Sequence, residues 1–135
     1  MPIPTFLARL LGKATRRTEA LPRSLIVQYR VSGWGSTADL EKRHRLEGVL
    51  GKRLEETDNG YCDGGDIGSG SINIYLEEVI DPQRACDSLV AVLQESGDLE
   101  RAVIALNLDP NGTREEGPCY QVLWPKDYSG DFSIL

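Results

Sequence analysis

A glycine-rich stretch that passes into strict alternation, residues 58–79, constrains the fold of this chain more than any other feature. It opens with the turn pair Asn59-Gly60 and carries four more glycines between residues 64 and 70. Apolar and polar side chains then alternate, with Ile72, Ile74 and Leu76 on one face and Asn73, Tyr75 and Glu77 on the other. A period of two is typical of a half-buried strand, and glycines before it indicate tight turns or a bulge. We predict a β-hairpin, residues 61–67 and 71–79, at the centre of a small sheet.

Hydrophobic periodicity and helix-end signals place five further elements around this hairpin. Ser36 and Asp39 resemble a capping box, and Asp81-Pro82 and Gly97 mark the start and the end of a second helix. Gly48 and Gly51 either weaken the first helix, by about 1 kcal/mol each relative to alanine, or let it lie close on the sheet. The predicted elements are strands 24–31, 101–108 and 120–124 and helices from Ser36 to about 57 and from 82 to 96, with the last ten residues irregular.

The order of the first six elements is strand, helix, strand, strand, helix, strand. In this order over residues 24–108, and in the glycine-rich hairpin 63–70, the chain resembles small bacterial ferredoxin-like domains. The resemblance implies an α+β fold: a ferredoxin-like βαββαβ sandwich whose antiparallel sheet has two helices on one face, here with an extra C-terminal strand. It brings no diagnostic catalytic motif, so it implies no particular activity.

Charge is distributed unevenly along the 135 residues, which carry a net charge of −6. Residues 1–23 form a basic segment with a balance of +4, and residues 24–135, which we expect to form the single domain, hold ten basic and twenty acidic residues. An acidic body argues against binding of nucleic acid. Residues 5–17 predict an amphipathic basic helix, for which packing on its own domain or fraying is favoured over contact with a membrane surface.

The cysteines and the N-terminus indicate a cytoplasmic protein. Cys62, Cys86 and Cys119 are too far apart in sequence for a zinc knuckle or a redox pair, and their number is odd. The N-terminal apolar run is interrupted by Arg9 and lacks the pattern of a secretory leader, so we expect reduced thiols. No motif in the sequence points to a cofactor.

Three motifs resemble ligand sites, and each has a stronger structural interpretation. Residues 33–38 match the dinucleotide pattern G-x-G-x-x-A, but a polar, glycine-rich segment follows where a second parallel apolar strand is required. The acidic groups at residues 58–66 and 109–113 lack the ligand order of a calcium loop and favour tight turns. His44, the sole histidine, falls on a charged helical face.

These observations favour a non-enzymatic protein-binding module of immunity or adaptor type, with a protein partner or a second copy of the chain as its target. The charge asymmetry and an exposed polar strand face around Asn73, Tyr75 and Glu77 support this hypothesis. The alternative is a small-molecule or metal-ion binding protein, or an enzyme, that uses the glycine-rich loops 33–36 and 63–70. Its candidate residues are Trp34, Tyr61, Asp63 and Asp66. Trp34 either stands at an interface or folds back under the sheet.

Overall fold

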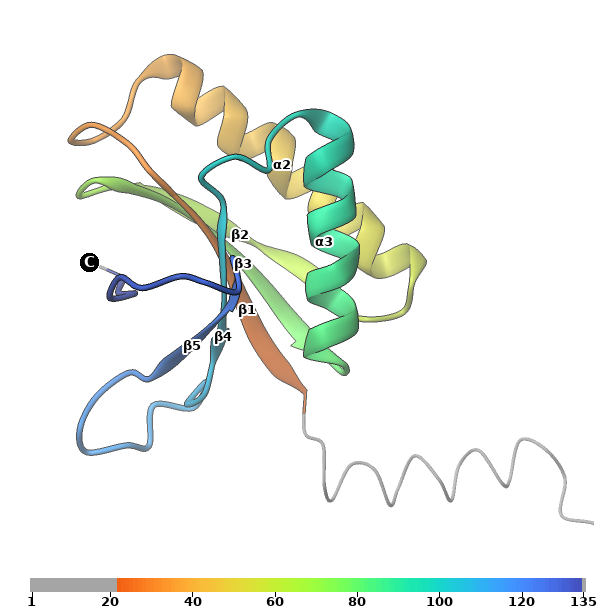
Figure 1. Ribbon diagram of the computed structural model, residues 1–135, viewed down its shortest axis with the longest axis vertical. Helices are drawn as coiled ribbons and strands as arrows, with labels where there is room; N and C mark the ends of the chain where they lie inside the picture. Colours follow the sequence, from red (N-terminus) through yellow and green to blue (C-terminus); the bar gives the residue numbers. More distant parts are fainter. Residues whose placement is uncertain (1–21, 135) are drawn as a thin grey trace, which may run out of the picture.

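The alternating stretch forms β3 (Ser71–Val79) in a computed structural model that describes residues 22–134. β3 pairs with β2 (Tyr61–Gly68) on one side and with β1 (Arg23–Arg30) on the other, and β4 (Val103–Asn107) and β5 (Tyr120–Trp124) follow beyond β1. The five strands form one antiparallel sheet in the order β2-β3-β1-β4-β5 (Figure 1). With α2 (Thr37–Glu56) and α3 (Pro82–Ser96) the domain is α+β, as the sequence predicts, and includes the extra C-terminal strand.

β1, and not the hairpin, occupies the centre of the sheet, which corrects the sequence-based placement. Six consecutive residues of β1 are buried because β3 and β4 flank the strand and both of its faces are covered. β2 is an edge strand, and its pairing with β3 is interrupted by a bulge between Cys62 and Gly65. A bulge of this kind twists an edge strand and protects it from pairing with another chain.

Local signals set the ends of both helices. The Ser36 hydroxyl accepts a hydrogen bond from the Asp39 amide at 3.1 Å, and the Asp39 carboxylate accepts one from the Ser36 amide at 2.9 Å, which completes the predicted capping box. The Asp81 carboxylate caps α3 by accepting a hydrogen bond from the Arg84 amide at 3.1 Å, and Gly97 ends the helix in the left-handed conformation, with φ of 78°.

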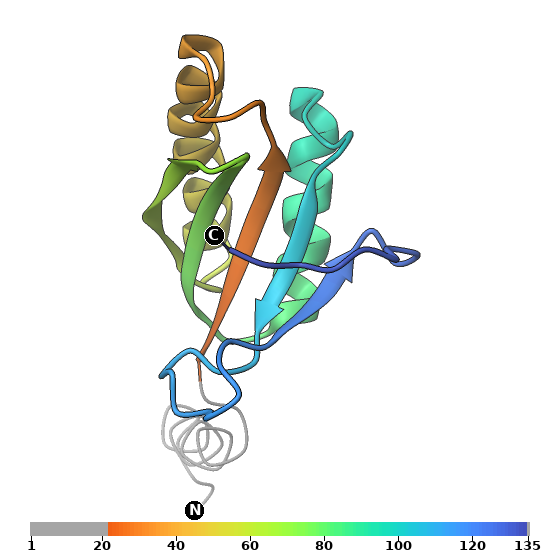
Figure 2. The same cartoon turned by 90° about the vertical axis from the view of Figure 1, so that its left-hand side faces the viewer.

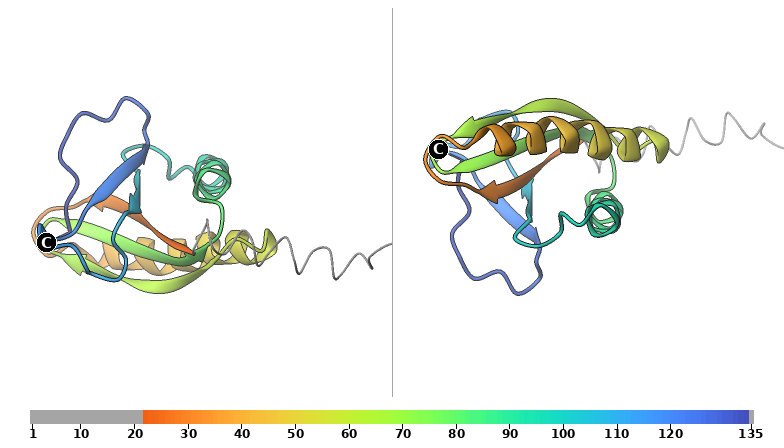
Figure 3. Two further views of the ribbon diagram at one scale, coloured as in Figure 1. Left: turned by 90° about the horizontal axis from the view of Figure 1, so that it is seen from below. Right: turned by 90° about the horizontal axis from the view of Figure 1, so that it is seen from above.

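Both helices cover one face of the sheet, α2 over β2 and β3 and α3 over β4 (Figures 2 and 3). Figure 3 shows α3 almost end-on while α2 extends across the view, so the two helices cross rather than run parallel. Between the layers lies the core, to which β1, β3 and β4 contribute alternate residues. Its fully buried side chains include Leu25, Val27, Leu46, Leu50, Leu54, Ile72, Ile74, Leu76, Leu89, Leu93 and Ile104.

Residues 125–134 contain no helix or strand, as predicted, but they cross the face of the sheet that the helices leave uncovered (Figure 2). The Ser133 carbonyl accepts a hydrogen bond from Gln28 of β1 at 3.0 Å, and the Phe132 ring meets that of Tyr120 edge-on at 5.1 Å. Asn73 is consequently only 1% exposed. The prediction of an exposed polar face is therefore wrong at Asn73, since the chain's own C-terminal segment covers this part of the sheet.

β4 begins two residues later than the periodicity predicts. Arg101 has a φ of 68°, in the left-handed region, so the chain turns at this residue and the regular strand begins after it. The predicted helix over residues 5–17 and most of the basic segment 1–23 lie outside the described residues.

Candidate functional site

The two glycine-rich loops singled out in the sequence meet at one end of the sheet. The amide of Val31 donates to the Gly70 carbonyl at 2.9 Å, and the amide of Gly70 donates to the Gly33 carbonyl at 2.7 Å. These bonds join the β1–α2 loop to the β2–β3 turn. We call the joined loops, residues 32–36 and 68–70, the tip.

Trp34 stands out from the tip with 78% of its surface exposed, which decides between the two orientations left open by the sequence. Its ring lies against the backbone of Gly68, where an added Cβ atom would sit 2.6 Å from the ring atom Cε3. Gly35 is equally close to its neighbour, since a Cβ atom there would meet Ile67 Cδ1 at 2.5 Å. Close packing between the loops therefore accounts for glycine at both positions.

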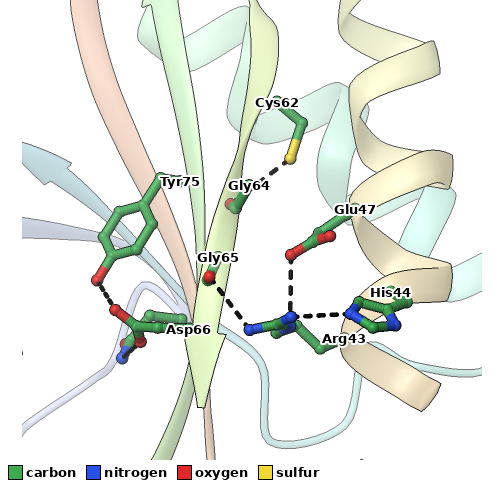
Figure 4. Close-up of polar contacts among 9 residues, drawn as sticks. Arg43, His44, Glu47, Cys62, Gly64, Gly65, Asp66 and Tyr75 are labelled. Atoms are coloured by element: carbon green, nitrogen blue, oxygen red, sulfur yellow. Dashed lines mark hydrogen bonds and ion pairs between the residues drawn. The ribbon is translucent and has the colours of Figure 1, made fainter. Parts of the chain in front are cut away.

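A chain of hydrogen bonds crosses the sheet from β2 to the C-terminal segment. Asp66 accepts from Asn73 Nδ2 at 2.9 Å and from the Tyr75 hydroxyl at 2.7 Å (Figure 4). Gln28 Nε2 donates both to Asn73 Oδ1 at 2.8 Å and to the Ser133 carbonyl. Burial, and then the bond to Asp66, raise the pKa of the Tyr75 phenol, so it remains a donor. These groups satisfy one another and hold the C-terminal segment on the sheet.

The remaining sequence-predicted residues do not take part in this series of hydrogen bonds. Glu77 accepts a hydrogen bond from the Ser24 hydroxyl and lies opposite Tyr61 in the sheet register. Tyr61 is only partly covered, and the nearby carboxylate of Asp63 is the largest influence that raises the pKa of its phenol. Asp63 is exposed at the bulge of β2. The structure thus places the candidate residues in three separate groups. Trp34 lies in the tip, Asp66, Asn73 and Tyr75 lie in the series of hydrogen bonds across the sheet, and Tyr61, Asp63 and Glu77 lie near the bulge of β2.

A cluster of titratable side chains beside β2 was not anticipated from the sequence (Figure 4). Arg43 of α2 donates to the Gly65 carbonyl at 3.2 Å, lies 3.4 Å from Glu47 in an ion pair and contacts His44 Nε2 at 2.8 Å. Its Nε is buried and lacks an aligned hydrogen bond among the described residues.

Cys62, on the same side of β2, has the Gly64 carbonyl as its hydrogen-bond acceptor, at 3.7 Å. Burial is the main influence on this thiol and raises its pKa, which disfavours the nucleophilic thiolate. Arg43 therefore fastens α2 to the edge strand, while His44 contacts Arg43 and the Cys62 thiol contacts the Gly64 carbonyl (Figure 4).

Among residues 22–134, no group of three or more His, Cys, Asp or Glu side chains is placed to hold a metal ion. The Asp109 carboxylate, one of the calcium-like positions, accepts from the amides of Thr113 and Arg114 and thereby closes its own turn. No helix in this part of the chain is both long enough and apolar enough to cross a membrane. No protein-family model matches the sequence, and searches of curated proteins and of solved structures found no match.

Proposed function

We propose that the domain is a non-enzymatic protein-binding module, of immunity or adaptor type, that contacts its partner through the tip. The observation that carries this proposal is the 78% exposure of Trp34 on loops fixed by backbone hydrogen bonds of 2.9 and 2.7 Å. Tryptophan is enriched among the residues that dominate binding energy. The loops of the tip are already ordered before binding, so little conformational entropy is lost in them when a partner covers Trp34.

The charge of the domain favours a basic partner. Residues 24–135 hold twenty acidic and ten basic residues. Opposite charge increases the rate of association more than the final affinity, and salt screens this effect. We therefore expect the association rate to fall as ionic strength rises, with a smaller change in the dissociation rate.

For the fold we propose the ferredoxin-like βαββαβ arrangement, formed by β1, α2, β2, β3, α3 and β4. The order β2-β3-β1-β4 within the sheet and the position of both helices on one face support it. β5 then extends this unit beyond β4.

Replacing Trp34 with alanine tests the proposed function. Proteins captured from the native cells by the wild-type chain and by the Trp34→Ala chain are compared, and the partner that differs is purified for titration. We expect its affinity to fall at least about thirtyfold, since hot-spot residues contribute about 2 kcal/mol or more.

Ile80→Ala is the matched control, because Ile80 is also a large exposed apolar residue, at 57%, but follows the opposite end of β3. This variant should bind as the wild type does. If a second copy of the chain is the partner, the same comparison shows dimers for the wild type and monomers for Trp34→Ala. Equal affinity in all three chains would contradict the proposal.

A further inference from the structure

A cavity of about 470 Å³ lies at the same end of the sheet as the tip, where the end of β1 and the start of β4 meet the C-terminal segment. Arg30 and Arg101 contribute charged side chains to its lining. Leu99, Trp124, Pro125 and Tyr128 contribute apolar surface. Cavities of this size with apolar walls and a few polar groups are typical of small-molecule sites.

The two arginines of this cavity differ from the others in the domain. Between residues 24 and 134 there are seven arginines, and five of them have internal partners. Four form ion pairs with carboxylates, and Arg84 donates to the Thr57 carbonyl. The side chains of Arg30 and Arg101 are exposed, and within residues 22–134 neither forms an ion pair with a carboxylate.

The charged residues that line the cavity are both basic, although the domain as a whole is acidic. Twenty acidic residues lie between 24 and 135, yet none of the described ones lines this cavity. Because both arginines line the cavity, an anion bound there is attracted by two positive charges. Guanidinium also forms paired hydrogen bonds with the two oxygens of a carboxylate.

The backbone at Arg101 supports a ligand-binding role. Its φ of 68° lies in the left-handed region, which costs about 1–2 kcal/mol for a residue with a Cβ atom. Glycine adopts this conformation without that cost. Strain of this kind is found preferentially where a side chain is needed for function.

We propose that the cavity binds a small organic carboxylate with a planar apolar body. The carboxylate lies between the guanidinium groups of Arg30 and Arg101, and the apolar body packs against Trp124 and Pro125. This site is separate from Trp34, and it was not visible in the sequence because its residues come from three distant segments.

Titration with 2-naphthoate, followed through the indole N–H resonance of Trp124, tests the proposal. The chain has two tryptophans, so a Trp34→Phe variant assigns the signal. We expect 2-naphthoate to shift the Trp124 resonance in a saturable manner and the neutral 2-naphthamide to bind much more weakly. The Arg30→Gln/Arg101→Gln double variant should lose at least about tenfold in affinity for 2-naphthoate.

Two further variants separate this binding from general charge and from folding. Arg53→Gln/Arg114→Gln removes the same charge from exposed ion pairs elsewhere and should retain the affinity. Arg101→Gly should raise the melting temperature, because the strain is relieved, and yet weaken binding. Absence of a Trp124 shift, equal binding of the neutral amide, or equal loss in both double variants would overturn the proposal.

Discussion

At Gly51 a single hydrogen atom in place of a side chain decides how closely α2 approaches β2. A Cβ atom at Gly51 would lie 2.9 Å from Cys62 Cβ, whereas one at Gly48 would meet nothing within 4 Å. The sequence predicts that these glycines either weaken the helix or allow close packing, and it cannot separate the two cases. Only the position of the helix on the sheet shows that Gly51 faces β2 and Gly48 faces solvent.

We therefore expect opposite effects of the same substitution at these two positions. Gly51→Ala should lower the free energy of unfolding by about 1–2 kcal/mol, because overpacking outweighs the gain in helix propensity. Gly48→Ala should raise it by about 0.5–1 kcal/mol through propensity alone. Urea unfolding of both variants measures these values. A stabilising Gly51→Ala would show that the contact with Cys62 relaxes without cost.

Asp98 is the second residue whose contribution can be isolated. Its carboxylate accepts two hydrogen bonds from Arg45, at 2.7 and 3.1 Å, and one from Ser96. The bond from Arg45 is the main reason that the pKa of Asp98 lies below its ordinary value. A carboxylate with a lowered pKa in the folded state stabilises the protein above its unfolded pKa and loses this effect as the pH falls through the folded pKa.

Asp98→Asn should accordingly destabilise the domain at pH 7, by about 0.5–1 kcal/mol, because solvent screens the half-exposed Arg45. The difference from the wild type should begin to shrink below about pH 4, the ordinary range of an aspartate. Thermal unfolding from pH 3 to pH 7 gives this comparison. A difference that does not change with pH would show that the ion pair contributes nothing to stability.

At the scale of elements, the C-terminal segment is what the sequence could not place. The period of two correctly assigns Asn73, Tyr75 and Glu77 to the face of β3 away from the helices. The same pattern fits a face open to solvent and a face covered by a polar network. Residues 125–134 have no periodicity of their own, so their position over β1 follows only from contacts such as that between Gln28 and Ser133.

Asn73 is the centre of that network, and its replacement removes one hydrogen-bond partner from each of two neighbours. Asn73→Ala removes a partner from both Gln28 and Asp66 and should cost about 1–3 kcal/mol. Tyr75→Phe removes one bond from the exposed Asp66 and should cost about 0.5–1 kcal/mol. Chemical unfolding ranks the two variants. An equal or smaller loss for Asn73→Ala would mean that water replaces the missing amide.

At the scale of the whole molecule, the features with local causes could be predicted and those with distant causes could not. The caps at Ser36 and Asp81 and the ends of the hairpin depend on neighbouring residues, and they lie within a residue of their predicted positions. The cavity at Arg30 and Arg101 depends on β1, the segment before β4 and the C-terminal segment coming together. The tip is intermediate, because both loops stand out in the sequence but their contact requires the sheet.

The central claim is that this acidic domain binds another protein through Trp34. Native mass spectrometry of the tagged full chain, isolated from its native cells, tests it most directly. We expect a second polypeptide in stoichiometric amount on the wild-type chain and on Ile80→Ala, and its loss from Trp34→Ala. A wild-type chain without any bound protein, or a complex that Trp34→Ala leaves unchanged, would contradict the account.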